Sequence, residues 1–244
     1  MSKVIVITGA GAGLGRAIAR RLAKDGHTLV LLGRTLATLQ AVADELGDCT
    51  AAIVCDVADA DSVRAAFATI AKIHPKIDVL INNAAIYEPF TIAEARDEQI
   101  LAPLLVNFAG PIFTARAVVP MMERGGHIIN VSSESVDHNF PMLALYQSTK
   151  AGLERFAHSL KLELEPQGIR VTTFRAGSMY EEGKTSNWEP DAAIRFVQAC
   201  LEVGINLQTR PFSHVDGVAQ LFRNVIDTPA DIQVNLIAVE ARKA

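Results

Sequence analysis

Val4-Ile5-Val6-Ile7-Thr8-Gly9-Ala10-Gly11-Ala12-Gly13-Leu14-Gly15 is the stretch of this sequence that decides the fold. Its first four residues are apolar and β-branched, which predicts a short strand buried on both faces of a sheet. A glycine-rich loop follows. The residues from Arg16 to Lys24 then predict a helix that ends at Gly26.

A strand, a glycine loop and a helix start together form an anion site, because free backbone N–H groups and the positive end of the helix dipole face the loop. Glycines let the backbone approach a pyrophosphate without a Cβ in the way. The pattern therefore favours a dinucleotide site over a merely tight turn. The loop residues predicted to hold the cofactor are Gly9, Gly11, Gly13, Leu14 and Gly15.

Strand-like and helix-like patterns alternate along the rest of the chain. Further strands are predicted at 28–32, 51–55, 77–81, 127–131, 169–174 and 234–239. Further helices are predicted at 36–46, 59–73, 98–108, 112–124, 145–165 and 216–226, with an interruption near Gly110-Pro111. This alternation predicts an α/β fold with one doubly wound parallel sheet and helices on both faces, in a single domain over residues 1–244.

The composition limits the classes of function. The 244 residues are 50% hydrophobic, and the net charge of −4 is dispersed, so no basic patch for nucleic acid is expected. Apolar runs such as Leu29 to Leu32 are too short to span a bilayer, and no signal peptide is expected. The three cysteines lack metal-ligand spacing, so we expect no metal site but buried or half-buried thiols in a reducing compartment, the cytoplasm.

The second strand bears on the choice of cofactor. Where a fold that prefers NAD places an acidic residue for the ribose hydroxyls, this chain has Gly33 followed by Arg34. A guanidinium pairs with a 2′-phosphate, so NADP(H) is favoured over NAD(H), although Arg34 could also be a solvated residue before the next helix. Asp56 and Val57 close the third strand, where Asp56 could contact adenine or cap the following helix.

Tyr146-Gln147-Ser148-Thr149-Lys150 places a phenol and an ammonium group one helical turn apart. A nearby cation stabilises a phenolate, so the sequence predicts that Lys150 lowers the pKa of Tyr146 and that the tyrosine exchanges protons. Ser133 stands 13 positions earlier, at the end of a predicted strand. Taken singly, these residues more often have structural roles, and it is their combination with the glycine loop that favours a catalytic one.

Four motifs in this order resemble the short-chain dehydrogenase/reductase family, over essentially the whole chain. Thr8 to Gly15 is similar to its TGxxxGxG loop, and Asn82-Asn83-Ala84-Ala85 is similar to its NNAG motif. Tyr146 to Lys150 matches its YxxxK motif, and Asn107 falls at its catalytic asparagine.

The resemblance implies a Rossmann-like fold and hydride transfer between NADP(H) and a carbonyl or secondary alcohol, as in a ketoreductase. Tyr146 would be the general acid or base, Ser133 would bind the substrate oxygen, and Lys150 would hold the nicotinamide ribose. Asn107 would hold a water that resupplies protons. Asn83, Gly177 and Met179 would contact the cofactor, while the family's usual proline and threonine are missing from Arg175 to Glu181.

Three further expectations remain. Residues 178–214 form an irregular stretch, with a helix at 194–203, that would cover a small-molecule substrate. The family's long helices pair across a two-fold axis, so a homo-oligomer, tetramer or dimer, is expected. The alternative function is a non-catalytic NADP-binding sensor or scaffold of the same fold, although such proteins usually lose the tyrosine or the lysine.

Overall fold

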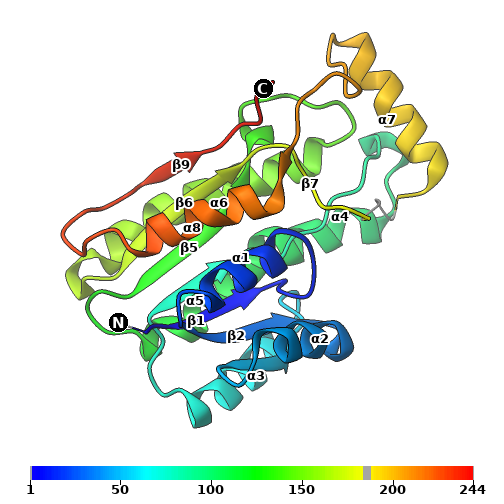
Figure 1. The fold of residues 1–244 in the computed structure, drawn as a ribbon. Coiled ribbons are helices and arrows are strands. Elements are labelled where there is room, and N and C mark those ends of the chain that lie inside the picture. Colours follow the sequence, from blue (N-terminus) through cyan, green and yellow to red (C-terminus); the bar gives the residue numbers. More distant parts are fainter. Residues whose placement is uncertain (1, 184–187, 244) are drawn as a thin grey trace.

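A computed structural model describes residues 2–183 and 188–243 of the chain, and its centre is a seven-stranded parallel sheet (Figure 1). The strand order is β3-β2-β1-β4-β5-β6-β9. The strands are β1 (Val4–Thr8), β2 (Thr28–Gly33), β3 (Thr50–Val54), β4 (Val79–Asn82), β5 (His127–Ser133), β6 (Arg170–Ala176) and β9 (Leu236–Ala238). The predicted doubly wound parallel sheet is confirmed.

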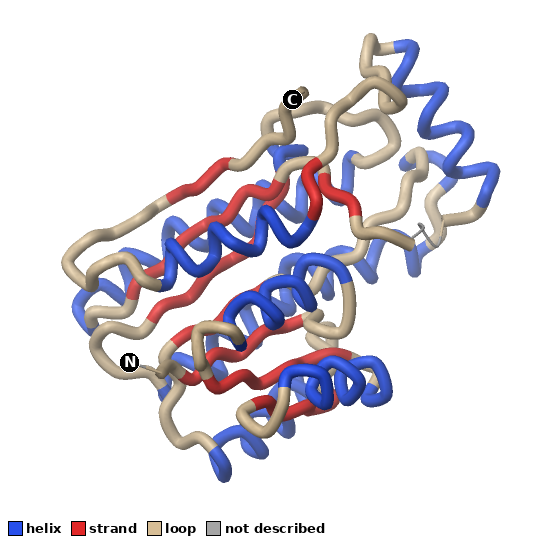
Figure 2. The backbone as a smooth tube through the Cα atoms, in the orientation of Figure 1, coloured by secondary structure: helices blue, strands red, loops and turns tan. Residues whose placement is uncertain are grey.

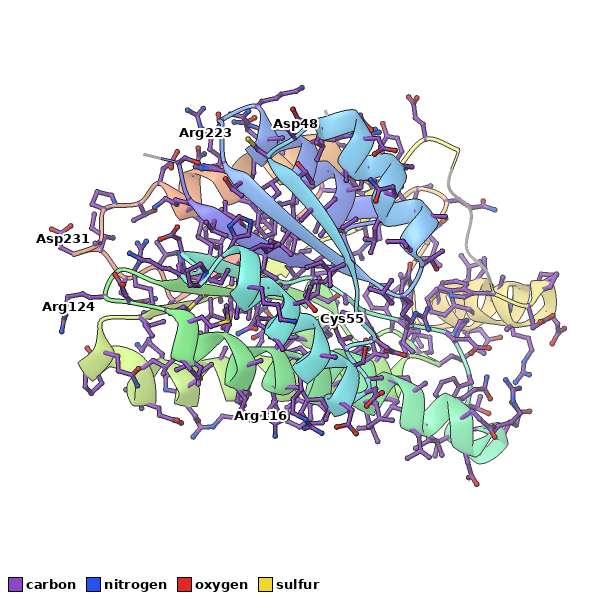
Figure 3. The ribbon with its side chains drawn as sticks, turned by 90° about the horizontal axis from the view of Figure 1, so that it is seen from below. Asp48, Cys55, Arg116, Arg124, Arg223 and Asp231 are labelled. Carbon is purple, nitrogen blue, oxygen red and sulfur yellow. The ribbon has the colours of Figure 1, made fainter. Side chains whose placement is uncertain are left out.

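Six helices cover the sheet, three on each face (Figure 2). One face is packed by α1 (Gly13–Ala23), α2 (Leu36–Leu46) and α8 (Val215–Ile226). The other is packed by α3 (Ala60–Ile73), α5 (Gly110–Val118) and α6 (Ala144–Leu164). In Figure 3, Arg223 of α8 and Arg116 of α5 lie on opposite outer sides of the molecule.

The strand β1 shows why both faces need cover. Ile5 and Ile7 belong to the core on the α1 side, whereas Val6 belongs to the core on the α6 side, and none of the three has exposed surface. Successive side chains of a strand point to opposite faces, so a run of apolar residues requires helices on both. The strand pairs with β2 on one side and with β4 on the other.

The position of β1 also locates a crevice. The chain runs from β1 outward to β3, then crosses back to β4 on the other side of β1. In open parallel sheets, ligands bind at the carboxyl ends of the strands where the order reverses in this way. The predicted site residues Gly9, Asn83, Ser133 and Gly177 lie at or just after the ends of β1, β4, β5 and β6, so the topology gathers these four at one edge.

The helical region before β5 departs from the prediction. The chain is helical through Gly110-Pro111, and the irregular segment lies one turn earlier, as a π-helix at Leu104–Ala109 between α4 (Asp97–Pro103) and α5. Pro111 lies in the first turn of α5, where its missing N–H does not interrupt the helix. The predicted break at the proline is therefore wrong.

This same region, Asp97–Met121, is the one helical stretch among the described residues that is long and apolar enough to cross a membrane. Of its most apolar 18-residue segment, 39% is buried inside the protein. Val106, Ala115 and Val118 belong to the core beside α6. Core helices of globular proteins show the same pattern, so length and composition are weak evidence for a membrane span.

Residues 178–214 are more regular than expected. They contain the short parallel strands β7 (Met179–Tyr180) and β8 (Ser213–His214) and the helix α7 (Pro190–Glu202), which starts four residues before the predicted one. In Figures 1 and 2, α7 projects beyond the carboxyl edge of the sheet. One cysteine was predicted wrongly, because Cys49 is exposed, whereas Cys55 and Cys200 are buried.

Candidate active site

The glycine loop between β1 and α1 is shaped by two left-handed backbone conformations and one close approach of the backbone. Gly9 and Gly13 have φ angles of +66° and +57°, in the left-handed region that favours glycine. A Cβ on Gly15 would lie 2.3 Å from the carbonyl oxygen of Gly9, so only glycine fits there. The loop therefore needs its glycines to fold, and it leaves the N–H groups at the start of α1 directed at the crevice.

A carboxylate already uses this anion site. Glu181, just after β7, accepts a hydrogen bond from the backbone N–H of Gly13 at 3.0 Å and pairs with Arg16 at 2.5 Å. A negatively charged group thus lies against the loop where the sequence predicts a pyrophosphate. The donors present fit a dinucleotide phosphate, and Glu181 is a residue that the sequence analysis did not identify.

Seven of the predicted cofactor residues line one cleft of about 320 Å³, namely Gly9, Gly13, Leu14, Arg34, Asp56, Val57 and Asn83. The predicted Gly11 and Gly15 are not among the residues that line it. Arg34 is exposed, next to Gly33 at the end of β2. Asn83 donates from its amide to the carbonyls of Thr8 and Gly9, at 2.9 and 3.3 Å, and so ties the end of β4 to the loop.

The alternative role of Asp56 as a helix cap is wrong. The carboxylate of Asp59 caps α3 by accepting from the N–H of Asp61 at 2.8 Å. Asp56 instead accepts from the N–H of Ala58 at 3.0 Å while lining the cleft. Of the two roles considered, only the one facing the cofactor cleft remains.

The predicted catalytic side chains meet at an adjoining pocket of about 450 Å³, whose lining includes Ser133, Tyr146, Lys150, Gly177 and Met179. Ser133 ends β5, and Tyr146 and Lys150 lie in the first two turns of α6. The Ser133 and Tyr146 side chains are hydrogen-bonded. Lys150 is almost fully buried, and its Nζ donates to the carbonyl of Val131 at 2.8 Å.

The predicted lowering of the Tyr146 pKa by Lys150 is wrong. Burial raises the pKa of Tyr146 to about 12, an effect that the hydrogen bond from Ser133 opposes and the nearby Tyr87 and Glu134 reinforce. Burial also lowers the pKa of Lys150 to about 8. The Lys150 Nζ lies 5.8 Å from the centre of the Tyr146 ring, and the cost of desolvating a phenolate outweighs the attraction of this cation.

Asn107 lies outside this pocket and contacts the backbone that leads to it. Its amide group accepts from the N–H of Ile86 and donates to the carbonyl of the same residue, both at 2.8 Å. It also donates to Thr149 Oγ at 3.3 Å, next to Lys150. The side chain thus fixes the segment after β4 against α6, and the position four residues on is Pro111, which has no N–H to offer the Asn107 carbonyl.

Aromatic side chains form the outer wall of the pocket. The Tyr87 ring centre lies 5.2 Å from those of both Tyr146 and Trp188, and Trp188 Nε1 donates to the carbonyl of Tyr87. Phe140, Phe196 and Phe212 complete this wall. Residues 178–214 were expected to cover the substrate, whereas the contribution of Tyr87 and Phe140 was not foreseen, because no motif marks them.

Residues 2–183 and 188–243 contain no group of three or more His, Cys, Asp or Glu side chains that could hold a metal ion. The site therefore consists of a phosphate-binding loop, a hydroxyl pair and a buried amine. This set is suited to binding a dinucleotide and to moving one proton at a substrate oxygen.

Comparisons with known proteins identify the family of the chain. The model of the short chain dehydrogenase family matches residues 3–191. Carbonyl reductase family member 4 from Danio rerio is 33% identical over 199 residues, covering 81% of this chain and 84% of that protein. The NADP-dependent 3-hydroxy acid dehydrogenase YdfG from Salmonella typhi is 35% identical over 179 residues, 71% of each chain.

A solved structure extends the similarity to the whole fold. A serine dehydrogenase complexed with NADP+ superposes with a TM-score of 0.83 at 26% identity, covering 97% of this chain and 94% of that one. The sheet order, the glycine loop and the family match lead to one conclusion: the chain belongs to the short-chain dehydrogenase/reductase family of oxidoreductases.

Proposed function

We propose that this protein is an NADP(H)-dependent carbonyl reductase, or in reverse a secondary-alcohol dehydrogenase, with Tyr146 as its general acid and base. The observation that carries the proposal is the meeting of Ser133, Tyr146 and Lys150 in a pocket adjoining the glycine-loop cleft. When bound, NADP(H) would supply or accept the hydride. The protein then has to position the substrate oxygen and manage one proton.

Tyr146 is the proton donor in the direction of reduction. Its raised pKa keeps the phenol protonated at neutral pH, as a general acid requires. The Ser133 hydroxyl, hydrogen-bonded to Tyr146, would orient the same substrate oxygen and stabilise its developing charge. Lys150 remains protonated at pH 7 with a pKa of about 8, and it would hold the ribose hydroxyls beside the nicotinamide.

Asn107 would support proton resupply through its backbone. The side chain is already hydrogen-bonded to Ile86 and Thr149. The water expected at this residue would therefore donate a hydrogen bond to the main-chain carbonyl of Asn107. Because residue 111 is proline, no N–H four residues on competes for that carbonyl. In this role Asn107 positions a water and does not touch the substrate.

The test is an assay of the purified protein with NADPH and a panel of ketones, followed by absorbance. We expect turnover in the wild type and a loss of about 10²- to 10⁴-fold in Tyr146→Phe, with unchanged NADPH binding. Tyr180→Phe, which removes an exposed phenol from β7, is the matched control and should keep activity. Tight NADPH binding without turnover of any carbonyl would favour the non-catalytic sensor.

The preference for NADP(H) rests on Arg34 at the rim of the cofactor cleft. We expect Arg34→Ala to raise the KM for NADPH by about 10- to 100-fold, since a charge-assisted hydrogen bond to phosphate is lost. The KM for NADH, which has no 2′-phosphate, serves as the internal control and should change little. An equal effect on both cofactors would show that Arg34 does not bind the 2′-phosphate.

A cytoplasmic location and a dimeric or tetrameric state belong to the same proposal.

A further inference from the structure

A buried ion pair lies behind the wall of the catalytic pocket. Glu134 follows Ser133 directly, and its side chain is only 8% exposed. Its Oε1 atom pairs with Arg210 at 2.6 Å and accepts a hydrogen bond from Ser178 Oγ at 2.7 Å. Arg210 Nε in turn donates to Ser178 Oγ at 3.1 Å, so the three side chains form a closed triangle.

Arg210 reaches the pocket through residues that line it. Glu134, Ser178 and Phe140 are all lining residues, and the guanidinium of Arg210 lies 5.1 Å from the centre of the Phe140 ring. It comes from the segment between α7 and β8, whereas Glu134 comes from the turn after β5. The guanidinium of Arg210, from the segment after α7, is thus held against the turn that follows Ser133.

Charge along the pocket wall is almost absent otherwise. Among the described lining residues, only Glu134 and Lys150 are charged, and Lys150 is bonded to the carbonyl of Val131. The apolar lining residues include Phe140, Leu143, Trp188, Phe196, Val197, Leu207 and Phe212.

This arrangement is unfavourable for a substrate carboxylate. Burying such a group requires a cation or several hydrogen-bond donors to replace its water. Two cations lie at this pocket: Lys150, which already donates to the carbonyl of Val131, and Arg210, which Glu134 neutralises. Glu134 would itself repel a second carboxylate. An uncharged apolar group meets no such penalty.

We propose that Glu134 determines substrate specificity: by neutralising Arg210 it reserves the pocket for uncharged, apolar carbonyl compounds and excludes those that carry a carboxylate. This inference rests on the proposed reductase function. It further implies that removing the negative charge of Glu134 frees Arg210 to bind a carboxylate, since specificity of this kind depends on a repulsive element.

The test compares two nearly isosteric ketones that differ in charge, 4-acetylbenzamide and 4-acetylbenzoate, with NADPH. We expect the wild-type kcat/KM to favour the amide by about tenfold or more. Glu134→Gln keeps an acceptor oxygen for Ser178 and Arg210. In this variant we expect the ratio of kcat/KM for the amide to kcat/KM for the benzoate to fall by about tenfold, because the benzoate is used faster. The double variant Glu134→Gln/Arg210→Met should restore the preference for the amide, because the freed cation is gone.

Glu94→Gln, which breaks an exposed ion pair with Arg195 on the outer surface, is the control and should leave the ratio unchanged. Equal use of both ketones by the wild type would overturn the inference without any variant, even if Glu134→Gln failed to fold. A Glu134→Gln protein with the wild-type melting temperature and an unchanged ratio would also overturn it. Failure to reduce any ketone would instead refute the proposed reductase, and this inference with it.

Discussion

At the scale of single residues, His127 links the core to the pH dependence of stability. Its ring is 2% exposed, and Nε2 lies 2.8 Å from Thr172 Oγ on the neighbouring strand. Burial lowers its pKa to about 3, with a smaller contribution from Arg170. The unfolded chain, with a pKa of about 6.5, therefore binds more protons between pH 6.5 and pH 3, and stability falls as the pH falls through this range.

We expect this one group to lower the free energy of unfolding by about 2 kcal/mol between pH 6.5 and pH 5. Urea unfolding at both pH values measures this change. His127→Gln, which cannot titrate, should be less stable at pH 7 but lose less stability on acidification. His158→Gln removes an exposed imidazole from α6 and should follow the wild-type profile. Identical pH profiles for all three proteins would mean that His127 is not buried as a neutral ring.

Also at the residue scale, the sequence could identify the reacting groups but not their energies. The spacing of Ser133, Tyr146 and Lys150 predicted a shared site, and the structure brings all three to one pocket. The direction of the shift in the Tyr146 pKa was predicted wrongly. Helical periodicity reveals that a cation is near, but the desolvation that raises the pKa depends on the whole fold. Glu134 and Arg210 lie 76 positions apart, and no motif joins them.

At the scale of elements, the short β7–β8 pair holds Glu181 against the start of α1. Under the proposed function, a pyrophosphate at the glycine loop would bind the N–H of Gly13, which this carboxylate occupies, so Glu181 would have to move away. We expect Glu181→Gln to lower the Kd for NADPH by about 3- to 10-fold, because the carboxylate no longer competes for the loop or repels the phosphates. Fluorescence titration with NADPH measures the change.

Glu182→Gln is the matched control, because Glu182 is exposed and adjacent. It removes the same charge from the same loop and should leave the Kd close to that of the wild type. Weaker NADPH binding by Glu181→Gln would contradict the competition and would indicate that Glu181 supports the loop through its pairing with Arg16.

Helices and strands could be predicted where the sequence pattern is regular. The predictions failed where tertiary contacts determine the local backbone. The alternation of β-branched runs with amphipathic segments was sufficient for the sheet, because parallel strands need apolar residues on both faces. The π-helix at Leu104–Ala109 was not predicted, and Asn107 within it bonds to Ile86 and Thr149, which are contacts between distant segments that no local pattern indicates. A proline in the sequence suggested the break at the wrong place, since Pro111 starts α5 without interrupting it.

At the scale of the whole molecule, an apolar surface on the α4–α5 region predicts self-association. Leu101, Leu104 and Leu105 are 55%, 37% and 42% exposed. The resemblance to the family predicts that the helices at 112–124 and 146–165 pair across a two-fold axis. The three leucines lie shortly before the first of these helices, where a second copy would cover apolar residues. We expect the wild type to be a dimer or tetramer of 26.2 kDa chains, and Leu105→Glu to shift it towards the monomer, as measured by light scattering.

Leu201→Glu, at a residue 44% exposed on α7, is the matched control and should keep the wild-type mass. A monomeric wild type would refute the assembly, whereas loss of mass in both variants would place the contact elsewhere.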